Sequence, residues 1–165
     1  MEPLTVVRGT MLLATVAWAA GEVLMRRSAS ADRLARALWT AGIVLAALHV
    51  ALALELIYGW NHEAAVAATA RQAGDRFGWP WRGGIYVNYA FLACWLADVC
   101  WWWAAPASRF ARSSRLEAIR VAAFTFMFFN GAVVFASPEG RLVGISAVAA
   151  VLFASPALRR VRVPA

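Results

Sequence analysis

Five long apolar runs constrain this chain more than any other feature of its sequence. They cover residues 4–24, 39–57, 86–105, 121–136 and 142–158. A helix needs about 20 mostly apolar residues to cross the hydrocarbon core of a bilayer, and the last two runs are shorter than that. Backbone polar groups inside lipid must be satisfied within the protein, so such segments cross it as helices. The sequence therefore predicts an all-α integral membrane bundle of about five transmembrane helices, forming a single domain over residues 1–165.

The composition argues against a water-soluble domain. Hydrophobic residues make up 62% of the chain and charged residues 15%, whereas soluble domains average roughly 45–50% and about 25%. A soluble protein of this size could not bury so much apolar surface. The net charge of +7 belongs to arginines clustered between the apolar runs, and the chain contains no lysine. That distribution is a topology pattern of membrane proteins, so we expect the lipid bilayer, not nucleic acid, to be the partner of this chain.

The arginine-rich loops predict the orientation of the bundle. Eleven arginines fall at one end of the predicted bundle and five at the other. The positive-inside rule assigns the richer end to the cytoplasm. We therefore expect a bacterial cytoplasmic (inner) membrane protein with its N-terminus outside and its C-terminus in the cytoplasm. Residues 17–19 fit a signal-peptide cleavage pattern, but cleavage there would leave the arginines of residues 26–36 outside, against the charge rule.

The one long loop, residues 59–84, falls outside in this orientation. Asn61 is a favourable N-cap, and residues 64–72 are good helix formers that end at Gly74. Aromatic residues at positions 77, 79, 81, 86 and 89 follow, at a density typical of the headgroup boundary. The tryptophans at 101–103 are predicted to form a matching belt at the inner boundary. The loop is therefore predicted to contain a short interfacial helix followed by an aromatic re-entry into the third span.

Polar residues in the outer half of the bundle suggest one candidate site. His49 and Glu55 lie in the second apolar run, and His62 and Glu63 follow in the outer loop. These residue types bind zinc, copper or iron. One ion could bind them only if the loop folded over the mouth of the bundle. The pattern is weak as a metal motif, because the pair at 62–63 lacks the second histidine of H-E-x-x-H.

A structural interpretation of the same residues is the alternative. His49 shares a helix face with the small residues Gly42, Ala46 and Ala53, so it is predicted to face protein and to bond Asn88 or Asn130 on neighbouring spans. Haem is disfavoured, because the two histidines would lie about 20 Å apart along a continuous helix. We therefore expect no cofactor, with a transition metal as the open alternative.

Ionisable residues also occur in the inner half. Glu22 lies four residues before Arg26, a spacing that predicts an ion pair on one helix face. Asp98 either pairs with an arginine across the bundle or stays protonated, as a proton relay would require. Arg120 is expected to extend its side chain toward the membrane boundary.

No motif in the sequence specifies a reaction. The chain lacks G-x-S-x-G, a Walker-type glycine loop and a plausible cysteine–histidine pair. Its short loops favour a non-catalytic subunit or accessory protein of a larger inner-membrane complex, with a protein partner or a second copy in the membrane. A metal-binding or redox membrane protein and a small transporter or channel are the alternatives, although five spans are an odd number for inverted repeats.

Overall fold

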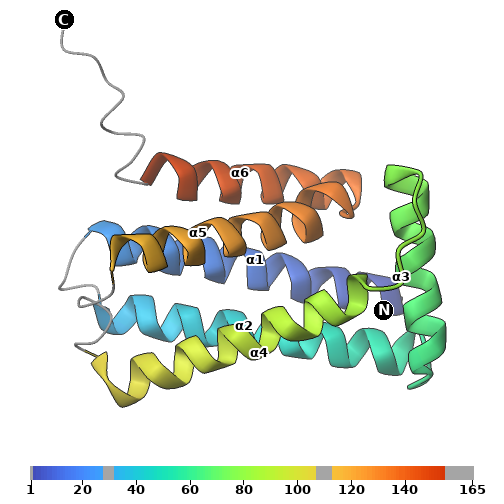
Figure 1. The fold of residues 1–165 in the computed structure, drawn as a ribbon, viewed down its shortest axis with the longest axis horizontal. Helices are drawn as coiled ribbons and strands as arrows, with labels where there is room; N and C mark the ends of the chain where they lie inside the picture. Colours follow the sequence, from blue (N-terminus) through green and yellow to red (C-terminus); the bar gives the residue numbers. More distant parts are fainter. Residues whose placement is uncertain (1, 28–31, 107–112, 155–165) are drawn as a thin grey trace, which may run out of the picture.

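The computed structural model describes residues 2–27, 32–106 and 113–154. Its elements are α1 (Pro3–Arg27), α2 (Asp32–Leu56), α3 (His62–Phe77), α4 (Gly84–Ala104), α5 (Ser114–Phe129), the π-helical turn η3 (Asn130–Val134) and α6 (Pro138–Ala154). In Figure 1, α3 lies across one end of a bundle in which α1, α2, α4, α5 and α6 run alongside one another. The regular structure of the described residues is helical throughout, so the prediction of an all-α fold is confirmed.

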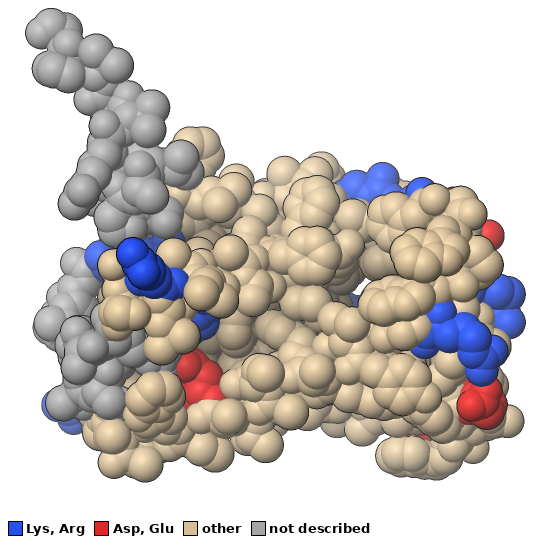
Figure 2. Space-filling view, in the orientation of Figure 1, with Lys and Arg blue, Asp and Glu red and all other residues tan. Residues whose placement is uncertain are grey.

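Among the described residues, four helical stretches are long and apolar enough to cross a membrane. They are Pro3–Arg26, Asp32–Leu56, Gly84–Ala104 and Ser114–Val134. The fifth predicted span, residues 142–158, corresponds to α6 up to Ala154, and its last four residues lie outside the described part of the chain. Figure 2 shows charged residues gathered toward the two ends of the visible face, with a broad uncharged band between them. The bundle is thus compatible with a multi-pass membrane protein.

The loop helix exists but ends later than predicted. The side chain of Asn61 caps α3 by accepting a hydrogen bond from the backbone N–H of Ala64 at 3.0 Å. The helix continues through Gly74 and stops at Gly78, whose φ of 72° provides the left-handed conformation of a C-cap. The prediction that it ends at Gly74 is wrong, because Gly74 stays helical and the left-handed C-cap conformation is adopted by Gly78.

The hairpin of α5 and α6 is closely packed. At the end of α5, the backbone N–H of Phe135 bonds the carbonyl of Asn130 at 2.9 Å, the i→i+5 spacing of a π-turn. Gly144 of α6 lies directly against this turn, and a Cβ atom there would overlap the carbonyl oxygen of Ala132. Pro138 begins α6, where its missing N–H removes no helical hydrogen bond.

The core of the bundle is aromatic. Four tryptophans are fully buried: Trp18, Trp39, Trp95 and Trp102. Trp18 of α1 stacks on Phe128 of α5 with ring centroids 4.3 Å apart. Gly42 makes room for Trp95, since a Cβ at Gly42 would lie 2.6 Å from the indole. The predicted inner belt is therefore wrong for Trp102, which faces the core, whereas its neighbours at 101 and 103 are exposed.

Candidate functional site: a buried ion-pair network

A buried carboxylate lies between two arginines near one end of the bundle. Glu22 of α1 has a side chain only 1% exposed. Arg120 of α5 donates to it through both terminal nitrogens, at 2.9 and 2.6 Å. Arg26, one turn along α1, donates to the same carboxylate at 2.8 Å. Three charged groups from two helices thus meet in a nearly dry environment.

Both arginines that bond Glu22 also make further contacts. Arg120 also donates to Glu117, one turn earlier on α5, at 3.0 and 2.6 Å. Arg26 donates to the backbone carbonyl of Val151 on α6 at 3.2 Å. The described contacts therefore join α1 to α5 and α6 through two arginines and two glutamates.

Arg120 also links the ion pairs to the aromatic core. Its guanidinium lies over the ring of Trp39 at 5.0 Å from the centroid, a cation–π arrangement. The indole N–H of Trp39 in turn donates to Asp98 of α4 at 2.9 Å. Through these contacts α2 and α4 reach the same cluster. A pairing of Asp98 with an arginine stays a prediction.

This arrangement favours a structural role over a chemical one. A charge removed from water is costly unless it is paired and hydrogen bonded. Glu22 and Arg120 each have charged partners at bonding distance. A general acid or base must be able to exchange its partner for substrate or water, and neither buried group is placed to do so without breaking an ion pair.

The sequence predicted part of this network. The spacing of Glu22 and Arg26 indicated their ion pair, which is present. Arg120 was expected to reach the membrane boundary, but its side chain is 7% exposed and turns into the bundle. That expectation is wrong because Glu22, 98 residues away in sequence, supplies a buried partner. The Glu117–Arg120 pair was not predicted from the sequence, although its i,i+3 spacing was a local pattern that could have indicated it.

The outer polar residues take separate partners. His49 of α2 contacts the backbone carbonyl of Val7 on α1 through Nδ1 at 2.8 Å. It therefore faces protein, as its helix position predicts, but its partner is a backbone group instead of Asn88 or Asn130. Asn130 donates to the carbonyl of Phe126 in its own helix at 2.8 Å, and Asn88 is exposed.

The remaining predicted ligands lie at the α3 end of the bundle and are exposed. Glu55 accepts a hydrogen bond from the indole of Trp60. His62 lies between two tyrosine hydroxyls of α4, each 3.4 Å from one ring nitrogen. Glu63 forms an ion pair with Arg82 at 2.7 Å. The described residues contain no group of three or more histidine, cysteine, aspartate or glutamate side chains arranged to hold a metal ion.

Comparison of the chain with protein-family models, with curated proteins and with solved structures finds no significant match. The case for a function therefore depends on the geometry of the molecule itself.

Proposed function

We propose that this chain is a five-span inner-membrane protein that serves as a non-catalytic subunit or accessory protein of a larger membrane complex. In this proposal the N-terminus is outside, the C-terminus is cytoplasmic and α3 lies at the outer interface. The observation that carries the proposal is the network of Glu22, Arg26, Glu117 and Arg120, in which the buried charges of Glu22 and Arg120 are paired within the chain.

A transporter or enzyme inside a membrane needs a polar group that can bind something other than its own chain. In the network, the groups that are most deeply buried are also the most completely paired. Glu22 is held by two arginines and Arg120 by two glutamates. Such a network fixes the relative positions of α1, α5 and α6, which is the role expected of a rigid scaffold.

Large exposed apolar side chains on α5 and α6 support a protein neighbour. Ile119 and Phe126 of α5 and Phe153 of α6 are each more than 60% exposed. These side chains are not covered by the rest of the described chain, so they are available to pack against another membrane helix. The surface of α5 and α6 that carries them is therefore the proposed contact with the partner.

Native mass spectrometry of the protein, extracted in mild detergent from its own membrane, tests the proposal. We expect a stoichiometric complex with another polypeptide and no bound metal. A photo-crosslinking amino acid placed at position 153, in place of Phe153, should crosslink to the partner. The same amino acid in place of Leu96, which is exposed on α4, should not crosslink to it. A single chain or homo-oligomer that carries one metal ion per copy would overturn the proposal.

A further inference from the structure

The face of α3 that packs on the bundle changes from apolar to polar along the helix. In the first half of α3, Ala65 and Val66 are buried in one cluster with Ile85 of α4. Gln72 lies two turns after Ala65, and Arg76 lies one turn further on, so both continue the same helix face. The second half of this face is therefore suited to a polar neighbour.

A polar hollow lies at the second half of α3. Figure 1 shows that α3 runs from the side of α2 and α4 to the side of α5 and α6. At that end Gln72, Asp75 and Arg76 line a hollow of about 360 Å³, together with Phe135, the residue that follows η3. The rings of Phe77 and Phe135 meet edge to face with their centroids 5.9 Å apart. This contact holds the end of α3 against the turn between α5 and α6.

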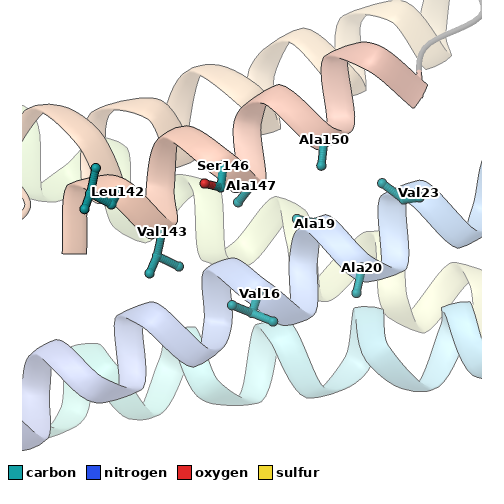
Figure 3. A pocket seen from close by; sticks show the side chains of 9 residues that line it. All are labelled: Val16, Ala19, Ala20, Val23, Leu142, Val143, Ser146, Ala147 and Ala150. Carbon is teal, nitrogen blue, oxygen red and sulfur yellow. The ribbon is translucent and has the colours of Figure 1, made fainter. Parts of the chain in front are cut away.

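A second hollow is larger but apolar, and it selects no particular ligand. Figure 3 shows this groove between α1 and α6, whose walls are mainly alanine and valine. Ser146 is the one polar residue among those that line it. Apolar contacts are not directional, so such a surface suits any apolar neighbour. The hollow at α3 instead presents an amide, a carboxylate and a guanidinium, which can discriminate between ligands.

The polar side chains of the hollow are available to a ligand. Within the part of the chain that the structure describes, the side chains of Gln72, Asp75 and Arg76 make no hydrogen bond or ion pair. Asp75 and Arg76 are adjacent in sequence, and adjacent side chains on a helix do not face each other. All three polar residues are exposed, so a ligand can reach them from outside the bundle.

Asp75 lies where the helix itself favours a cation. It is three residues before Gly78, the C-cap of α3, and the C-terminal end of a helix carries partial negative charge. A carboxylate at that end is unfavourable alone, but it strengthens the attraction for a bound cation. Arg76, in the same last turn, provides the opposite charge. The hollow therefore offers one group for a cation and one for an anion.

We propose that this hollow binds a phosphoethanolamine group, with the primary ammonium on Asp75, the phosphate on Arg76 and Gln72, and the methylene groups against Phe135. A ligand with a single charge would leave one of the two charged side chains unpaired, whereas this zwitterion pairs both. The same group occurs as the headgroup of phosphatidylethanolamine and as a free molecule. The lipid source rests on the proposed position of α3 at the outer membrane interface, but neither source depends on a protein partner.

Native mass spectrometry of the purified full chain tests the ligand. The protein is mixed with phosphatidylethanolamine, phosphatidylglycerol or phosphatidylcholine of identical acyl chains, and the lipid retained after collisional activation is compared. Phosphatidylglycerol has no ammonium, and the quaternary ammonium of phosphatidylcholine has no N–H to donate to Asp75. An exposed ion pair changes affinity by at most about fivefold, so we expect phosphatidylethanolamine to be retained about threefold to fivefold better than either. Equal retention of the three lipids would overturn the proposal.

Matched variants on the same helix locate the site. Asp75→Asn should lower the retention of phosphatidylethanolamine to that of phosphatidylglycerol, without lowering the latter. Glu63→Gln removes the same charge at the other end of α3, outside the hollow, and should keep the preference. Arg76→Gln should weaken the retention of all three lipids, whereas Arg71→Gln, exposed on α3 but not in the lining of the hollow, should not. A preference that survives Asp75→Asn would contradict the proposal.

Free phosphoethanolamine separates the two sources of the ligand. It is added to the protein in detergent without lipid, with glycine as a zwitterion that lacks phosphate. Binding of free phosphoethanolamine that Asp75→Asn abolishes would support the site and show that the headgroup suffices. Binding of phosphatidylethanolamine alone would assign the site to the phospholipid. Binding of neither, or of glycine in preference to phosphoethanolamine, would overturn the proposal. These results are separate from the subunit proposal, which is scored by the polypeptides that copurify.

Discussion

Methionine in place of Arg120 removes the guanidinium at the centre of the buried network while keeping a long unbranched side chain. Arg120 makes four N–H···O contacts of 3.0 Å or less, two to Glu22 and two to Glu117. Glu117 is 36% exposed and can be hydrated after the change. Glu22, at 1% exposure, cannot. The cost therefore falls mainly on the carboxylate of Glu22.

The magnitude follows from this burial. Removing one partner of a buried ion pair costs about 3–5 kcal/mol. Glu22 keeps Arg26 at 2.8 Å, so we expect the lower end of that range, a loss of about 3 kcal/mol in the free energy of unfolding. For a chain of this length, each kcal/mol lowers the melting temperature by about 2–4 °C. Arg120→Met should therefore lower it by about 6–12 °C.

Tryptophan fluorescence during thermal unfolding in detergent measures this loss, since four buried indoles report on the core. Arg82→Met is the control, because the Arg82–Glu63 pair is largely exposed and such pairs contribute at most about 1 kcal/mol. Adding Glu22→Gln to Arg120→Met should recover about 1 kcal/mol, because the buried carboxylate that has lost one of its two arginines is replaced by a neutral amide. A melting temperature for Arg120→Met within 2 °C of the unmodified protein would refute the reasoning.

Three further predictions concern packing, metal and topology. Gly144→Ala should lower the free energy of unfolding by about 1–3 kcal/mol, because the added methyl group overlaps a carbonyl of η3. Gly9→Ala is the control and should not lower it, because a Cβ at Gly9 meets nothing within 4 Å. Equal melting temperatures for the two variants would contradict the prediction. His49→Ala should lower the melting temperature while metal content by elemental analysis stays at zero; loss of a stoichiometric metal would refute it. In a cysteine-free background, an impermeant maleimide should label Arg71→Cys in intact cells but Arg115→Cys only after lysis; the reverse pattern would overturn the orientation.

The sequence predicted the helices well because lipid leaves few alternatives. Long apolar runs must be helical inside a bilayer, and the cap at Asn61 depends only on its immediate neighbours. The Glu22–Arg26 pair was predictable for the same reason, since i,i+4 neighbours on a helix face always lie close together. Features that are local in sequence were therefore the ones that sequence reasoning identified.

Features that depend on helix packing were not predictable. Arg120 looked like a boundary residue because its partner is 98 residues away. The contact of His49 with a backbone carbonyl has no sequence pattern, since every residue supplies such a carbonyl. The close approach of Gly144 to Ala132 requires knowing which helix faces are in contact. The groove between α1 and α6 likewise exists only once the two helices are side by side.

The buried network also has a consequence for biogenesis. Glu22 is synthesised 98 residues before Arg120, which at about 5–20 residues per second is an interval of about 5–20 s. During that time α1 must remain in or beside the membrane with its carboxylate uncompensated by α5. Arg26, made immediately after Glu22 and on the same face, is the counter-ion available for this period. Arg26 therefore matters for insertion as well as for the folded state. Its loss should reduce the amount of inserted protein, even where the molecules that do fold keep most of their stability.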